Sequence, residues 1–161
     1  MGSVGPGNGW WAQKMNGSDW DSLSIRNFHY PDDYDKVLAL WKSAGQGIHV
    51  RRSDEPGEIQ KKLQRDPDLF LLAEQEGQVV GTVLGGFDGR RGMVYHLAVQ
   101  GEYRLRGIGD ALMEELERRL KQKGCIRYYL MVTYDNQEAI RFYEKRGWER
   151  MNLYTYGKDL D

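Results

Sequence analysis

The most constraining feature of this chain is the stretch from residue 93 to residue 132, where a strand-like run leads through a glycine-containing loop into a long amphipathic helix. Over residues 107–123, apolar side chains recur every four positions, at Ile108, Leu112, Leu116 and Leu120. Charged residues fill the other face, as expected for a helix with one buried side. Gly124 closes the helix as a C-cap, and Ile126–Val132 reads as the next strand. This order predicts one parallel β-α-β crossover.

The remaining segments alternate short apolar runs with turn residues, which predicts further strands and helices. A Glu76-Gly77 turn separates the runs Leu69–Glu74 and Val79–Leu84, so we expect a β-hairpin there. The other expected elements are a strand at Ser24–Phe28, helices beginning at Pro31-Asp32-Asp33 and at Pro56, a helix over Asp135–Arg146, and two short strands within Trp148–Leu160. We therefore expect an α/β (α+β) fold, with a mixed, mostly antiparallel central sheet flanked by about four helices.

The length of the chain, 161 residues, suits one domain with its own hydrophobic core. Residues 1–22 differ from the rest in composition, because they hold five glycines and three tryptophans without a helical or strand period. We expect a flexible tail or a loosely docked arm over residues 1–22, and one domain over residues 23–161.

The composition argues against several classes of protein. A net charge of −1, from 23 Lys plus Arg against 24 Asp plus Glu, is unlike a protein that coats nucleic acid or an anionic membrane. The single cysteine, Cys125, forms no internal disulfide and no cysteine-based zinc site, and the three histidines lack ligand spacing, so we expect no metal. No apolar run has the length of a membrane span or the character of a signal peptide. We expect a cytoplasmic protein.

The loop Arg104-Leu105-Arg106-Gly107-Ile108-Gly109 carries the clearest chemical signal. Its two glycines let the backbone approach a ligand closely, and the first turn of the following helix offers unpaired N–H groups. That geometry binds phosphate, and the two arginines add positive charge. A P-loop needs Lys and Ser/Thr where this chain has Asp110-Ala111, and a Rossmann fingerprint needs glycine where it has Leu112. The alternative is that the glycines only shape a strand-to-helix turn.

Two sequence blocks, in order and with a strand between them, match the patterns of one known family. The first is Leu97-Ala98-Val99 followed by the loop Arg104–Gly109, and the second is Asn136-Gln137-Glu138-Ala139-Ile140-Arg141-Phe142-Tyr143-Glu144-Lys145-Arg146-Gly147-Trp148. They are similar to the acetyl-CoA loop Arg/Gln-x-x-Gly-x-Gly/Ala and the segment Asn-x-x-Ala-x-x-Phe-Tyr-x-x-x-Gly-Phe of the GCN5-related N-acetyltransferase (GNAT) superfamily. The chain resembles this superfamily in element order from about residue 25 to residue 160, and the stretch Asp68–Val99 looks like its small bacterial members. The resemblance implies an acetyl-CoA-dependent N-acetyltransferase without a metal.

The resemblance also implies which residues hold acetyl-CoA. The pyrophosphate would be held by the backbone N–H groups of Arg104, Leu105, Arg106, Gly107, Ile108 and Gly109. The backbone of Leu97, Ala98 and Val99 would lie along the pantetheine arm like an added strand, which needs this strand to splay from Ile126–Val132, often at a bulge. Asn136 would hydrogen-bond the cofactor, although Asp135-Asn136-Gln137-Glu138 also suits a helix cap.

For catalysis, the resemblance implies direct attack of an amine on the thioester, with Tyr143 as the acid that protonates the departing thiolate. Simple packing on the sheet is the alternative role for Tyr143. Some family members use a glutamate as base four residues ahead of Leu97, where this chain has Met93. Strand alternation predicts Tyr95 on the same face as Leu97, and His96 on the other face as a satisfied structural histidine. The base is therefore open, with His49, Asp88, Glu76 or a relayed water as candidates.

The charge distribution bears on the acceptor. Residues 1–89 carry a net charge of −4, residues 90–127 carry +4 and residues 128–161 carry −1. The positive block holds the phosphate loop, and the acidic block supplies the expected acceptor loops, which favours a small cationic amine. An aminoglycoside antibiotic is one candidate acceptor. A protein or peptide N-acetyltransferase and a non-catalytic acyl-CoA-binding module are the alternatives, and a homodimer is possible.

Overall fold

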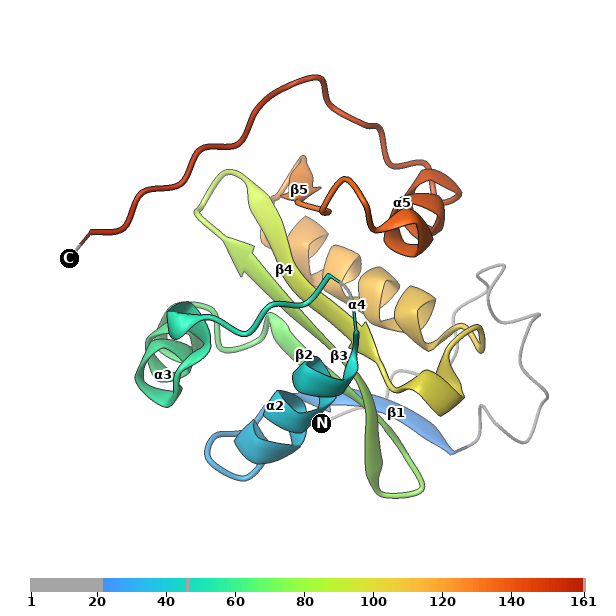
Figure 1. Cartoon of the computed structure of the whole chain (residues 1–161). Helices are drawn as coiled ribbons and strands as arrows, with labels where there is room; N and C mark the ends of the chain where they lie inside the picture. Colours follow the sequence, from blue (N-terminus) through green and yellow to red (C-terminus); the bar gives the residue numbers. More distant parts are fainter. Residues whose placement is uncertain (1–21, 46, 161) are drawn as a thin grey trace. The chain divides into compact units, whose positions relative to one another are not determined.

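The computed structural model describes residues 22–45 and 47–160 (Figure 1). These residues form two compact units, 22–131 and 132–160. The tail expected over residues 1–22 lies, apart from Ser22, outside the described residues. Among the described residues, no helix is long and apolar enough to cross a membrane.

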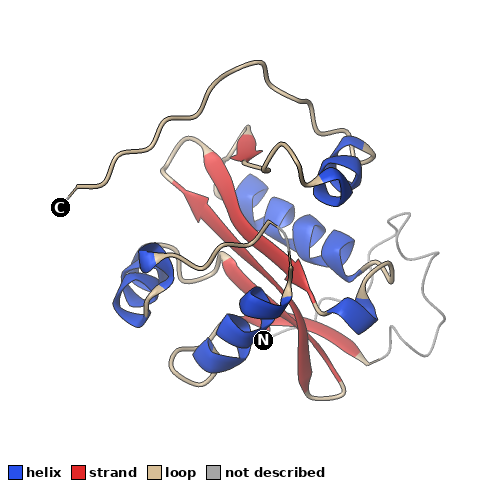
Figure 2. Ribbon diagram, in the orientation of Figure 1, coloured by secondary structure: helices blue, strands red, loops and turns tan. Residues whose placement is uncertain are grey.

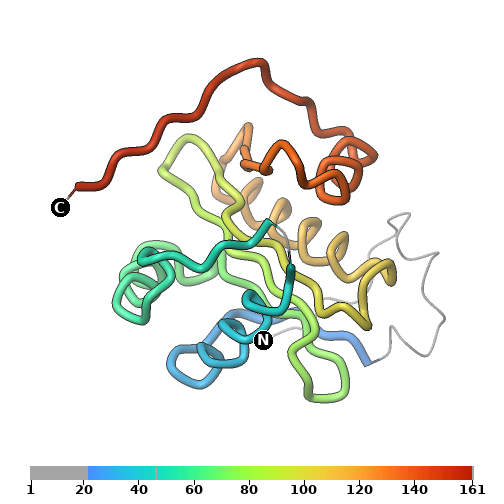
Figure 3. Tube along the Cα trace, viewed as in Figure 1, coloured from blue at the N-terminus to red at the C-terminus, as the bar shows by residue number. Residues whose placement is uncertain are grey.

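The first unit is built on a five-stranded sheet whose strands follow one another in the order β1-β2-β3-β4-β5. Neighbouring strands are antiparallel, except that β4 and β5 are parallel. The strands are β1 (Leu23–Asn27), β2 (Phe70–Gln75), β3 (Gln78–Phe87), β4 (Gly92–Val99) and β5 (Tyr128–Leu130). The tube in Figure 3 follows the crossover from β4 through a helix back to β5. The expected mixed, mostly antiparallel sheet with one crossover is confirmed.

Helices cover both faces of this sheet (Figure 2). In the first unit they are α2 (Tyr34–Ser43), α3 (Pro56–Arg65) and α4 (Ile108–Gln122), with short 3₁₀ turns at η2 (Arg52–Asp54) and η3 (Gly101–Tyr103). Helices α2 and α3 pack on one face, here called the α2/α3 face, and α4 packs on the opposite one, the α4 face. The second unit holds α5 (Gln137–Glu144), and Gly147 follows it with a φ of 80°.

Aromatic stacking fills the core on the α2/α3 face. The rings of Phe28 and Phe70 stack with centroids 4.2 Å apart, and Trp41 of α2 stacks on Phe70 at 5.9 Å. All three side chains are buried. Truncation of a buried Phe or Trp to alanine lowers the free energy of unfolding by about 3–5 kcal/mol. This stack therefore holds α2 on the sheet.

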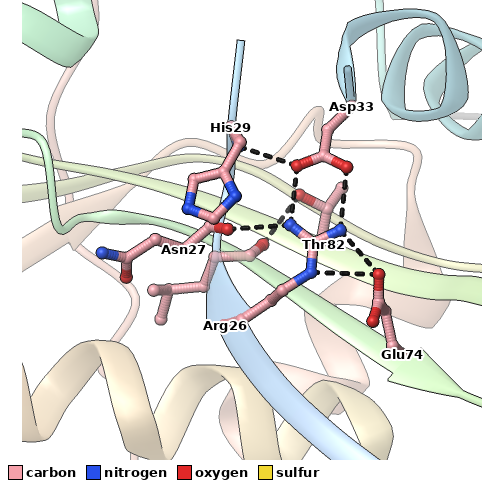
Figure 4. Close-up of polar contacts among 7 residues, drawn as sticks. Arg26, Asn27, His29, Asp33, Glu74 and Thr82 are labelled. Atoms are coloured by element: carbon pink, nitrogen blue, oxygen red, sulfur yellow. Dashed lines mark hydrogen bonds and ion pairs between the residues drawn. The ribbon is translucent and has the colours of Figure 1, made fainter. Parts of the chain in front are cut away.

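A polar network ties the start of α2 to the sheet edge (Figure 4). The Arg26 guanidinium donates to both carboxylate oxygens of Asp33 at 2.6 and 2.8 Å, and its Nε donates to Glu74 Oε1 at 3.0 Å. The backbone N–H of His29 donates to Asp33 at 2.7 Å. Burial by itself would raise the pKa of Asp33, but the bonds from Arg26 and His29 outweigh it and hold that pKa below its usual value. The network therefore keeps Asp33 ionised just before α2.

The C-terminal segment differs from expectation. Residues 149–160 form neither helix nor strand, so the two strands predicted within Trp148–Leu160 are wrong. Their alternating apolar pattern is typical of a strand, but a strand exists only where a second strand completes its hydrogen bonds. Strand β5 is also shorter than the predicted run of residues 126–132, for the same reason: only three residues find partners on β4.

Candidate functional site

Strand β4 parts from its parallel neighbour β5 partway along its length. The pairing joins Gly92–Val94 to Tyr128–Leu130 and then stops. From residue 95 to residue 99, β4 keeps β3 on one side, and no described residue pairs with its other edge. Within residues 22–131, the parting of the two strands that the resemblance requires is present, and the outer edge of residues 95–99 has no strand partner. We call it the open edge of β4.

A β-bulge in β4 marks the same point. Leu84 of β3 pairs with His96, whereas the next residue, Gly85, pairs with Val94. Tyr95 is therefore an extra residue in β4, left without a cross-strand partner. A bulge of this kind interrupts the alternation of side chains between the two faces.

The bulge changes which face Tyr95 and His96 occupy. The ring of Tyr95 lies over Gly86 and 6.0 Å from the Lys62 ammonium of α3, while the ring of His96 packs against Trp41 of α2 with centroids 4.8 Å apart. Both side chains thus lie on the α2/α3 face. The prediction that they lie on opposite faces is wrong, because it assumed unbroken alternation.

The open edge of β4 presents backbone groups of two predicted site residues. The N–H of Gln100 donates to the carbonyl of Val80 at 2.8 Å. Gln100 therefore turns its backbone groups toward β3, and this fixes which residues of β4 do so and which do not. In an antiparallel ladder, every second residue turns its N–H and C=O away from the partner strand. Leu97 and Val99 are those residues, so their backbone groups point to the open edge. The intervening Ala98 is buried on the α2/α3 face.

The loop after β4 forms a cradle of backbone N–H groups. Leu105 and Gly107 both have left-handed backbone conformations, with φ of 64° and 84°. Gly107 is the N-cap of α4, and no side chain caps the helix. Within residues 22–45 and 47–160, no backbone N–H from Leu105 to Gly109 donates to another group. Such a run of free donors at a helix N-terminus fits an anion.

The two arginines of the loop have different environments. Arg104 donates from Nε to the carbonyl of Val99 at 3.2 Å and from Nη2 to the carbonyl of Ala44 at 2.8 Å, so its guanidinium links the end of β4 to the end of α2. Arg106 is exposed and lies over the ring of Tyr103 at 5.2 Å. Sequence reasoning missed this structural role of Arg104, because its partner Ala44, the C-cap of α2, is 60 positions away.

His96 is bonded within the protein, as expected, although its partner lies far away in sequence. Its Nε2 lies 3.1 Å from Oδ1 of Asp54, and the N–H of Arg51 donates to Oδ2 of Asp54 at 2.9 Å. Burial would raise the pKa of Asp54, but these bonds outweigh it and lower that pKa. The pair fastens the connection between α2 and α3 to the bulge of β4.

In the second unit, Asn136 and Tyr143 lie at the two ends of α5. Asn136 accepts a hydrogen bond at Oδ1 from the N–H of Ala139 at 3.2 Å, which confirms its capping role. The ring of Tyr143 makes edge contacts with Phe142 and Trp148, with centroids 5.1 and 5.6 Å apart. Burial raises the pKa of Tyr143 to about 12, so its phenol keeps its proton at neutral pH.

Comparison with known proteins adds to this geometry. Residues 30–148 match the acetyltransferase (GNAT) family. A curated acetyltransferase of Pectobacterium atrosepticum is 42% identical over 139 residues, which span 86% of this chain and 96% of that protein.

Two solved structures share the fold. The PaiA N-acetyltransferase from Thermoplasma acidophilum, solved with coenzyme A, superposes with a TM-score of 0.71 at 20% identity, over 83% of this chain and 93% of that one. An aminoglycoside acetyltransferase from an uncultured soil metagenomic sample, solved with trehalose, has a TM-score of 0.66 at 18% identity, over 87% and 98% of the two chains.

Proposed function

This chain belongs to the acetyltransferase (GNAT) family and is an acetyl-CoA-dependent N-acetyltransferase, and we propose that it acetylates a small primary amine at the open edge of β4. The observation that supports this placement is the direct continuity of that edge with the N–H cradle of residues 105–109. We further propose a cytoplasmic location, as the sequence predicts.

The residues of the first unit fit the donor. The N–H groups from Leu105 to Gly109, which donate to no group among the described residues, and the positive end of α4 would hold its pyrophosphate, with the exposed guanidinium of Arg106 beside them. The N–H of Arg104, which the resemblance also implies, already donates to the carbonyl of Gly101 at 3.3 Å. The backbone groups of Leu97 and Val99 would bond its pantetheine amides along the open edge. Acetyl-CoA supplies an acetyl group activated as a thioester. Asn136 of the second unit is proposed as a further donor contact.

The acceptor attacks as a free amine. An alkyl amine with a pKa of about 10.4 is neutral in only about one molecule in a thousand or fewer at pH 7, which costs about 4–5 kcal/mol. Met93 stands where some family members have a glutamate, and a thioether takes up no proton. His96 is already bonded to Asp54. We propose that the proton leaves the amine through water.

Tyr143 is proposed as the acid. As the amine nitrogen bonds to the acetyl carbon and the carbon–sulfur bond breaks, the phenol gives its proton to the leaving sulfur and is reprotonated from solvent. The raised pKa of Tyr143, about 12, keeps that proton in place until the thiolate leaves. A backbone N–H near Val99, on the open edge, is proposed as the donor to the developing oxyanion.

Thiol release from acetyl-CoA across a panel of amines tests the proposal, and the panel includes aminoglycosides, polyamines, amino acids and short peptides. Tyr143→Phe is expected to lower kcat about a hundredfold or more. Tyr134→Phe, at a tyrosine that is 91% exposed, is the matched control and is expected to leave kcat unchanged. Equal rates for the two variants would refute the acid role.

Calorimetric binding of CoA without turnover of any amine would favour a non-catalytic acyl-CoA-binding module. Light scattering would decide whether the chain is a homodimer.

A further inference from the structure

The α2/α3 face of the sheet carries an aromatic and cationic surface at the point where β4 and β5 part. It is formed by Tyr95, Tyr129, Lys62, Arg91 and Arg127, and we call it the β4–β5 surface. Tyr95 is the bulge residue, and its side chain is 53% exposed. The surface therefore begins where the open edge of β4 begins, on the side of the sheet opposite α4.

The position of Tyr129 follows from its neighbour and its register. The hydroxyl of Tyr128 donates to Glu117 of α4 at 2.9 Å, so Tyr128 lies on the α4 face. Side chains alternate along a strand, which puts Tyr129 on the α2/α3 face, beside its register partner Met93. Tyr129 and Tyr95 thus share one face, on two strands that are separating.

Cations surround these rings. The guanidinium carbons of Arg91 and Arg127 lie 5.8 and 5.6 Å from the centroid of Tyr129. Both arginines are exposed, and within the described part of the chain the guanidinium of Arg91 has no carboxylate partner. The Lys62 ammonium over Tyr95 is, in contrast, ion-paired with Asp66. Among the described residues, the Arg91 guanidinium therefore forms no ion pair and is available to bind an incoming anion.

The acidic side chains next to the surface are already bonded to the chain itself. Asp88 accepts the backbone N–H groups of Arg90 and Arg91 at 2.7 and 2.6 Å within the β3–β4 turn. Asp66 is paired with Lys62, and its second contact is the N–H of Phe87 at 3.4 Å. Asp88 stays ionised and interacts electrostatically with Arg91, because the N–H groups that bond it are neutral and lower its pKa. The three cations Lys62, Arg91 and Arg127 against the two carboxylates Asp66 and Asp88 leave this region with a formal charge of +1, although the chain as a whole carries a net charge of −1.

We propose that the β4–β5 surface binds a carboxylate on the acceptor, so that the preferred substrate is an amine that also carries a carboxylate, as amino acids do. The inference rests on the proposed function and narrows its acceptor class. An exposed guanidinium beside an aromatic ring offers a carboxylate two parallel N–H donors. The same positive charge disfavours the ammonium form of the acceptor, which lowers the pKa of its amine and increases the reactive fraction. Polyamines and aminoglycosides carry no carboxylate for this contact, and their additional ammonium groups are repelled by the same positive charge.

Matched pairs of amines that differ only in the carboxylate provide the test. Phenylalanine is compared with phenethylamine, lysine with cadaverine and histidine with histamine, by thiol release from acetyl-CoA. We expect the carboxylated member of at least one pair to have a kcat/KM about tenfold or more above its partner, which corresponds to about 1.4 kcal/mol. Arg91→Gln is expected to remove most of that preference by raising KM for the carboxylated amine, whereas KM for the decarboxylated amine is expected not to rise, because that amine loses no contact and is repelled less.

The matched control is Arg90→Gln, because Arg90 is exposed on the same turn and makes no ring contact that the structure describes. It is expected to keep the preference. Equal or better turnover of the decarboxylated amines would overturn this inference and leave the N-acetyltransferase proposal standing. If no amine of either kind releases thiol, the proposed function fails, and calorimetry of phenylalanine with the CoA-loaded protein then decides. Binding that Arg91→Gln abolishes supports a carboxylate site, and no binding overturns it.

Discussion

The contact between Gly85 of β3 and Leu116 of α4 offers a quantitative test of how α4 is seated. A Cβ on Gly85 would lie 2.5 Å from Leu116 Cδ1, 3.0 Å from Cδ2 and 3.3 Å from Cγ. Leu116 is fully buried, so it has no free space into which it can turn. Overpacking of a filled core costs about 1–3 kcal/mol. Alanine also lowers the conformational entropy of the unfolded chain relative to glycine, which raises the free energy of unfolding by about 0.5–1 kcal/mol.

Gly85→Ala is therefore expected to lower the free energy of unfolding by about 1 kcal/mol, within a range of about 0–2.5 kcal/mol. Leu116→Ala alone is expected to cost about 2–5 kcal/mol, because it leaves a cavity. In the double variant the new methyl group occupies part of that cavity, so the combined loss is smaller than the sum by about 1 kcal/mol or more.

Urea denaturation of the wild type, the two single variants and the double variant measures this coupling. Gly57→Ala serves as the control, because a Cβ there meets nothing within 4 Å and the residue lies in α3. It is expected to be neutral or slightly stabilising. Strictly additive losses in the double variant would refute the steric explanation.

Two further predictions concern the pH dependence of stability and the shape of the loop. The pKa of Asp54 is lowered on folding, so its contribution is present above its unfolded value of about 3.9 and is lost as pH falls through the lower folded value. Unfolding free energy measured between pH 6 and pH 2 should therefore fall less steeply in Asp54→Asn than in the wild type, and identical slopes would contradict the assignment. Leu105→Gly should be more stable than Leu105→Ala by about 1 kcal/mol in thermal unfolding, because only glycine is unstrained at a φ of 64°, and both should bind CoA alike because the backbone N–H groups remain.

The amino-acid sequence alone determined the elements whose pattern is local. The four-residue spacing of apolar side chains predicts α4, and Glu76-Gly77 predicts the turn between β2 and β3, where both residues have positive φ. The loop from Arg104 to Gly109 is recognisable because its glycines and the following helix are adjacent in the chain. Each of these depends on interactions within a few residues, which composition and spacing express directly.

Only the tertiary structure decided the features that join distant segments. The bulge at Tyr95 depends on the register between β3 and β4. A change of one residue in that register cannot be recognised from the sequence of β4 alone. The partner of His96 lies 42 positions away, and that of Arg104 lies 60 positions away. Residues 149–160 have a strand-like sequence pattern and yet form no strand. A segment becomes a strand only where its backbone hydrogen-bonds to a neighbouring strand, and the sequence of the segment does not show whether one is present. The chain thus encodes its loop and helix locally, while the position of each charge around the open edge is set by pairing across the fold.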